Sequence, residues 1–175
     1  MKTLYTLAYP EFLDDGLEGI EEIRRLYDPQ YALVLPHFTM VCASDARIAE
    51  GEYLKHIRSV CRSAQPFQFV CRYVMFDLDA RTGKAYACLV PDEGFSNIAR
   101  LHDSLYRGVL AQSLRLDIPY IPHITIASNL DPNDAKNLCD ELNTQGAKVT
   151  GRVGAMTVAA LENARITDLA TFEFR

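Results

Sequence analysis

The sequence contains one pentapeptide pattern twice, as Pro36-His37-Phe38-Thr39-Met40 and as Pro122-His123-Ile124-Thr125-Ile126. Both copies read proline, histidine, apolar residue, threonine, apolar residue. A single His-Thr pair on a strand is typical of a satisfied structural pair. Its duplication in one chain instead indicates an internal repeat and a site to which both copies contribute.

The two-residue spacing has a direct structural meaning, because residues i and i+2 of a strand point to the same face. We therefore expect strands over His37–Ala43 and His123–Ala127, with each histidine and its threonine on one face. The residues expected to enter the core are Phe38, Met40, Ile124 and Ile126. If two similar half-structures face each other, the two His-Thr pairs converge on one cleft.

Such a pairing suits phosphoryl chemistry. Imidazole titrates near neutral pH, so one ring can take a proton from water while the other protonates the leaving oxygen. The hydroxyls of Thr39 and Thr125 can donate to non-bridging phosphate oxygens and stabilise the charge that develops there. The scheme needs no metal and no other cofactor. The remaining histidines, His56 and His102, lie in predicted helices and are expected to be surface or packing residues.

The rest of the chain predicts an α+β fold with several hairpins and about four helices, in one domain spanning residues 1–175. Helices are expected over Phe12–Tyr27, Ala46–Ala64, Phe95–Leu110, and from the cap at 129–132 to about Gly146. Further strands are expected over Leu4–Tyr9, Pro66–Asp79, Ala85–Val90, Ala155–Leu161 and Leu169–Phe174, and an irregular segment over Gln112–Pro122.

The composition and charge argue against several classes of protein. The net charge of −5 argues against coating of extended nucleic acid, which requires many Lys and Arg residues, but it allows recognition of one nucleotide or an RNA end. No apolar run approaches the roughly 20 residues of a membrane span, and the N-terminus does not resemble a secretion signal. Five scattered cysteines fit a reducing compartment, and Cys42, Cys71 and Cys88 are expected in the core. We expect a cytoplasmic monomer without a membrane partner.

At these motifs the sequence resembles the 2H phosphoesterase superfamily, and within it the 2′-5′ RNA ligase and cyclic phosphodiesterase-like branch. The stretch from Arg24 to Pro29, continued by Leu35 to Met40, is similar to that branch's approach to its first motif. Tyr120–Ala127 is similar to its second motif. One departure is Ser128-Asn129, where relatives often carry a basic residue.

The resemblance implies a two-lobed, pseudo-symmetric fold, each lobe an antiparallel sheet backed by helices, with the active-site cleft between them. It also implies metal-independent hydrolysis of 2′,3′-cyclic or related phosphodiesters by His37, Thr39, His123 and Thr125. Because the basic residue after the second motif is absent, Arg72 and Arg115 are candidates for the positive charge at the phosphate. Tyr9 and Tyr120 are candidates for stacking on a base or sugar.

Three functions remain open from the sequence. The first is a phosphoesterase that opens a cyclic phosphate or cleaves a 2′-5′ linkage of an RNA end or small nucleotide. The second is a non-catalytic module that holds a phosphorylated ligand in the same cleft. The third is metal-dependent hydrolysis, which the absence of a His-x-His motif or clustered acids beside the repeats disfavours.

Overall fold

A computed structural model of the protein describes residues 2–42 and 48–175. The strands are β1 (Thr3–Ala8), β2 (Glu11–Phe12), β3 (Phe38–Val41), β4 (Phe67–Asp79), β5 (Lys84–Glu93), β6 (Ile124–Leu130), β7 (Val149–Val153), β8 (Ala155–Glu162) and β9 (Arg165–Glu173). The helices are α1 (Gly16–Tyr27), α2 (Glu50–Cys61), α3 (Phe95–Leu105) and α4 (Pro132–Thr144), with a short 3₁₀ helix, η1 (Gly108–Ser113).

The nine strands of the described residues join one curled antiparallel sheet in the order β2-β7-β4-β5-β6-β3-β1-β8-β9. The sheet divides into two halves, β2-β7-β4-β5-β6 and β3-β1-β8-β9, which meet where β3 pairs with β6. The expected two lobes are therefore two halves of one continuous sheet, and the predicted α+β class is confirmed.

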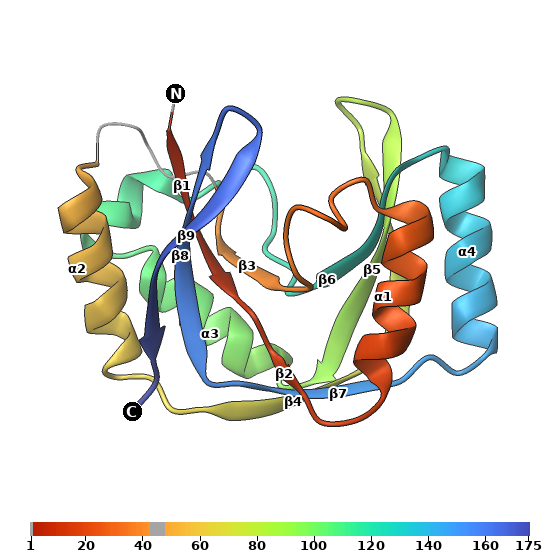
Figure 1. Ribbon diagram of the computed structural model, residues 1–175, viewed down its shortest axis with the longest axis horizontal. Helices are drawn as coiled ribbons and strands as arrows, with labels where there is room; N and C mark the ends of the chain where they lie inside the picture. The colour runs from red at the N-terminus through yellow and green to blue at the C-terminus, as the bar shows by residue number, and fades with distance from the viewer. Residues whose placement is uncertain (1, 43–47) are drawn as a thin grey trace.

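Helices back each half of the sheet (Figure 1). α1 and α4 cover the half that contains β4, β5, β6 and β7, whereas α2 and α3 pack on the half that contains β3, β8 and β9. In the sequence, each motif strand follows a helix that packs on the other half of the sheet. α1 precedes β3, and α3 precedes β6.

The junction between the halves is fully buried. Phe38 on β3 is opposite Ile124 on β6, and both side chains are fully buried. The Phe38 ring packs edge-to-face on Phe69 of β4, with ring centroids 5.0 Å apart. Met40 and Ile126 are also buried, at 1% exposure each, as the alternation in the two motifs predicts.

Several boundaries differ from the sequence prediction. The first helix begins at Gly16 rather than at Phe12, because Phe12 belongs to β2 and pairs with Gly151 of β7. The third helix ends at Leu105 rather than at Leu110, and the chain turns through Gly108 at φ 55° into η1. Strand β7 was not predicted. The strand expected to end at Ala43 and the helix expected to begin at Ala46 extend into residues 43–47, which lie outside the described residues.

Candidate active site

The strand register brings the two motifs onto one face of the sheet. Because Phe38 is opposite Ile124 in an antiparallel pair, His37 is placed opposite Thr125, and Thr39 opposite His123. The two histidines are then diagonal neighbours, for which ordinary sheet geometry gives a separation of about 7–8 Å at the backbone. All four side chains are half-buried, in contrast to their fully buried apolar neighbours.

Both imidazoles are held in the same way. The Nδ1 of His37 donates to the carbonyl of Leu35 at 2.7 Å, and the Nδ1 of His123 donates to the carbonyl of Ile121 at 2.8 Å. A carbonyl can only accept, so each neutral ring carries its proton on Nδ1 and leaves the Nε2 lone pair free. Each acceptor lies two residues before its histidine, with a buried proline between them. The repeat is thus a repeat of side-chain orientation as well as of sequence.

A β-bulge follows the threonine of each motif. Against β1, Thr39 is opposite Leu7 and Val41 is opposite Thr6, so Met40 is an extra residue. Against β5, Thr125 is opposite Cys88 and Ala127 is opposite Ala87, so Ile126 is extra. An extra residue shifts the alternation of the residues that follow it. The two bulges occupy equivalent positions, which extends the pseudo-symmetry beyond the motifs themselves.

A small cleft of about 130 Å³ opens on this face. Three of the four motif side chains line it, namely His37, Thr39 and Thr125, whereas His123 does not line it and is placed by the register. The other lining residues are Arg24, Asp28, Gln30, Val34, Leu35, Pro36, Tyr86 and Ser128. Sequence reasoning did not select Arg24, Asp28, Tyr86 or Ser128 as site residues.

The environment of His37 favours its neutral form. Burial lowers the pKa of His37 below its usual value of 6.5, and the positive charges of Arg24 and of a protonated His123 lower it further. The hydrogen bond to Leu35 and the carboxylate of Asp28 oppose this shift. A ring that stays neutral at physiological pH can accept a proton.

A buried polar network lies beside His37. Arg24 is 2% exposed; its Nε donates to Asp28 at 3.1 Å, and its Nη1 donates to Glu21 at 3.0 Å. The second carboxylate oxygen of Asp28 accepts from the hydroxyl of Ser128 on β6 at 2.8 Å. The i,i+4 spacing of Arg24 and Asp28, within a stretch already noted for its family likeness, was the signal in the sequence that could have indicated this pair.

The four predicted substrate-binding residues are not brought together. Tyr9 lies beside His37, with ring centroids 6.0 Å apart, and its hydroxyl donates to Asp168 at 3.2 Å. Arg72 pairs with Asp92 and Glu93, and Arg115 pairs with Asp117. Tyr120 stacks on His102 at 3.6 Å and donates to the backbone carbonyl of Thr39 at 3.1 Å. None of the four lines the cleft.

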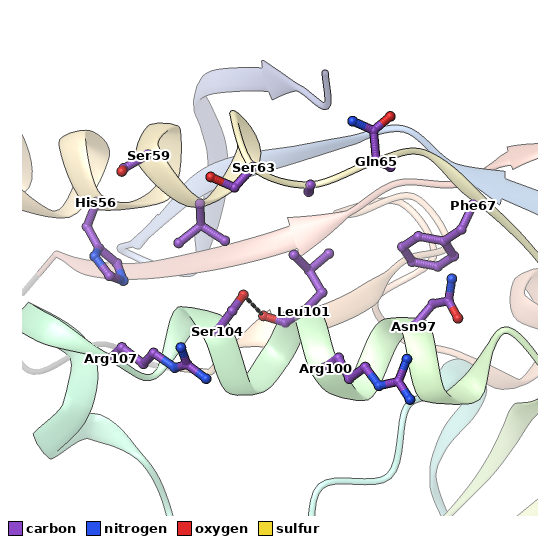
Figure 2. Close-up of a pocket in the computed structure, with 12 residues that line it drawn as sticks. His56, Ser59, Ser63, Gln65, Phe67, Asn97, Arg100, Leu101, Ser104 and Arg107 are labelled. Carbon is purple, nitrogen blue, oxygen red and sulfur yellow. Dashed lines mark hydrogen bonds between the residues drawn. The ribbon is translucent and has the colours of Figure 1, made fainter.

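A larger cavity, of about 510 Å³, lies between α2 and α3, away from the motifs. Figure 2 shows side chains of α2, including His56 and Ser59, facing Arg100 and Ser104 of α3 and Arg107, which follows that helix. His56 is fixed through its Nε2, which donates to the carbonyl of Leu105 at 2.8 Å. Of the described residues that line it, none is a threonine and one is a histidine, so this cavity does not have the His-Thr pairs of the motifs.

Cys71 and Cys88 are buried as expected, but Cys42 is exposed, so that expectation was wrong. β3 ends at Val41, one residue before Cys42. Within residues 2–42 and 48–175, no three His, Cys, Asp or Glu residues are grouped so that they could hold a metal ion. Over the same residues, no helix is both long and apolar enough to cross a membrane.

Comparison with known proteins places the chain in a family. Residues 7–165 match the sequence model of the 2′-5′ RNA ligase superfamily. The chain belongs to the 2′-5′ RNA ligase superfamily. Members of this superfamily are 2H phosphoesterases, so the protein is a phosphoesterase of that type, and the resemblance noted in the sequence is confirmed.

Curated relatives in the superfamily agree with this placement. A candidate phosphoesterase of Oceanobacillus iheyensis is 26% identical over 125 residues, which cover 71% of this chain and 70% of the relative. A candidate phosphoesterase of Geobacillus is 28% identical over 154 residues, covering 85% of this chain and 84% of the relative.

Solved structures share the superfamily fold. The TT0787 protein of Thermus thermophilus has a TM-score of 0.65 at 18% identity, covering 99% of this chain and 98% of that one. E. coli LigT complexed with ATP has a TM-score of 0.60 at 17% identity, covering 99% and 97%. Usb1 of Kluyveromyces marxianus with uridine monophosphate has a TM-score of 0.56 at 9% identity, covering 95% and 97%.

Proposed function

We propose that the protein hydrolyses 2′,3′-cyclic or 2′-5′ phosphodiesters of RNA ends or small nucleotides, with His37 and His123 as its acid–base pair. The observation that carries the proposal is the pairing of Phe38 with Ile124. This register aligns two His-x-Thr motifs on one face, each with a free imidazole Nε2. Hydrolysis of a phosphodiester needs two such groups, one for the attacking water and one for the leaving oxygen.

The two histidines differ in environment, and this difference suggests their roles. We assign the base to His37, because burial and the Arg24 guanidinium favour its neutral, proton-accepting form. His123 then donates a proton to the leaving oxygen. Thr39 and Thr125 stand opposite the partner histidines, and in our proposal their hydroxyls donate to the non-bridging phosphate oxygens.

The charge of the cleft favours a substrate with one negative charge. Its lining contains one cation, Arg24, and one anion, Asp28, which pair with each other, and Arg24 also pairs with Glu21. The cleft therefore offers little net positive charge for a phosphate dianion. A phosphodiester carries only one negative charge, which a protonated His123 balances.

The nucleotide ligands of E. coli LigT and of Usb1, ATP and uridine monophosphate, support a nucleotide as the class of substrate. Tyr9 is the residue we propose for contact with the base or sugar, because it adjoins His37. Arg72, Arg115 and Tyr120 have no comparable support. We expect the protein to act as a cytoplasmic monomer, without added metal.

The test uses two leaving groups. Wild-type protein should hydrolyse a 2′,3′-cyclic nucleotide, and His37→Asn and His123→Asn should both abolish most of the rate. A p-nitrophenyl phosphodiester has a leaving group that needs no proton, so it should restore much of the rate in His123→Asn but not in His37→Asn. Binding of the cyclic nucleotide without turnover by wild type would support the non-catalytic module instead.

A further inference from the structure

Arg24 is a charged side chain that is almost completely buried, at 2% exposure. Its three nitrogens each have a partner: Asp28, Glu21 and the backbone carbonyl of Val34, which accepts from Nη2 at 2.6 Å. A buried ion pair is weak evidence for stability, because desolvation offsets most of its attraction. Arg24 and Asp28 also line the cleft that contains His37. These facts indicate that the pair serves the site.

A short chain of contacts leads from Arg24 to His37. Arg24 holds the carbonyl of Val34, and the next carbonyl along the chain, that of Leu35, accepts from the Nδ1 of His37 at 2.7 Å. Arg24 therefore holds the peptide group directly before the one whose carbonyl orients His37.

Asp28 connects the same segment to the second motif. One carboxylate oxygen accepts from Arg24, and the other accepts from Ser128, three residues after Thr125 on β6. In a regular strand Ser128 would face away from Thr125, but the extra residue Ile126 returns it to the cleft. Asp28 thus ties the approach to His37 to the strand that carries Thr125.

We infer that Arg24 and Asp28 are positioning residues of the proposed reaction, Arg24 orienting His37 through the Val34–Leu35 segment and Asp28 coupling that segment to β6 through Ser128. The inference deepens the proposed function and rests on it. Among the described residues, the charged and titratable groups around His37 are Arg24, with its partner Glu21, and Asp28 from α1 and its C-terminal end, Tyr86 of β5, His123 before β6, and Tyr9 after β1 with its partner Asp168 on β9.

Arg24 and Asp28 carry opposite charges beside His37, so removing them should shift the pKa of His37 in opposite directions. A residue that only stabilises the fold would not produce this pattern. In Arg24→Met the pKa of His37 should rise, because a positive neighbour is lost; in Asp28→Asn it should fall, because a negative neighbour is lost. The ring is followed by NMR titration, independently of activity. The same variants should lower kcat by about 10- to 100-fold, the effect of a misplaced catalytic group, with a smaller change in KM.

A further variant separates charge from geometry. Arg24→Lys keeps the charge but not the planar fork, so the pKa of His37 should stay near its wild-type value while kcat falls. If Arg24→Met does not fold, Arg24→Lys and Asp28→Asn carry the test. The matched control is Arg25→Met, which removes the same charge from an exposed neighbour on α1 and should change neither kcat nor the His37 titration.

The possible failures are distinguishable. If wild-type protein turns over no phosphodiester, the proposed function fails, whatever the NMR titration shows. If wild type is active but folded Arg24 and Asp28 variants keep their kcat, or shift the pKa of His37 in the same direction, the positioning role is overturned. Equal effects of Arg24→Met and Arg25→Met would overturn it as well.

Discussion

Replacement of His37 by asparagine should remove activity while leaving the fold intact. The amide nitrogen of asparagine occupies the place of Nδ1, so His37→Asn keeps the donor to the Leu35 carbonyl that the imidazole makes at 2.7 Å. It has no group in the place of Nε2, and therefore no base. The variant separates the structural bond of the side chain from its chemistry.

The expected magnitudes follow from these two parts. Loss of a general base lowers turnover by at least about 100-fold, which corresponds to about 2.7 kcal/mol of transition-state stabilisation. Because the bond to Leu35 is retained, the free energy of unfolding should change by less than about 1 kcal/mol, the net contribution of one hydrogen bond. A domain with a typical stability of about 5–15 kcal/mol stays folded after such a change.

The assay is hydrolysis of a 2′,3′-cyclic nucleotide under single-turnover conditions, with urea unfolding measured on the same preparation. His56→Gln is the matched control, since glutamine keeps the contact that His56 makes through Nε2 to Leu105 while changing a histidine remote from the cleft. That variant should turn over at the wild-type rate. A folded His37→Asn protein within about threefold of wild type would refute the acid–base assignment.

Four other expectations are open to direct measurement. Thr39→Val and Thr125→Val should each reduce kcat about 10- to 100-fold with an unchanged circular dichroism spectrum, whereas unfolding would show that the hydroxyl is structural. Since the base must be neutral and the pKa of His37 is lowered, the loss of activity on the acidic side should occur only below pH 6.5; an acidic limb of kcat/KM above that value contradicts the assignment. Saturating EDTA should leave the rate unchanged, and a strict requirement for added divalent metal would favour the metal-dependent alternative. Phe38→Ala should lower the free energy of unfolding by about 3–5 kcal/mol in urea titration, because Phe38 is fully buried against Phe69; a loss under 1 kcal/mol would show that the junction is not central to the core.

The motifs could be interpreted from the sequence because the information in them is local. The two-residue period of a strand is enough to send Phe38 and Ile124 into the core and to keep His37 and His123 on the other face. The family likeness adds the two-lobed arrangement. Both predictions depend on residues within a few positions of each other, and the fold agrees with them.

The network beside the motifs could not be found in this way. In the sequence, Arg24 is a basic residue in the last turn of a helix, where a solvated side chain complements the helix dipole. Its burial arises because the segment after α1 folds over it and supplies the Val34 carbonyl. Its link to Ser128 depends on the bulge at Ile126, and a bulge depends on the partner strand. Such features follow from long-range pairing.

Because of the bulge at Ile126, the side chain at position 128 points into the cleft and determines which group pairs with Asp28. Counting every second residue from Thr125 leads to Ala127, which is fully buried, whereas the chain turns Ser128 into the cleft and then adopts a left-handed backbone conformation at Asn129, whose φ is 61°. A long cation at position 128 would meet the carboxylate of Asp28 and compete with Arg24 for it. A short hydroxyl leaves that carboxylate to Arg24. The side chain at position 128 thus determines whether the carboxylate of Asp28 pairs mainly with Arg24 on α1 or with a residue on β6.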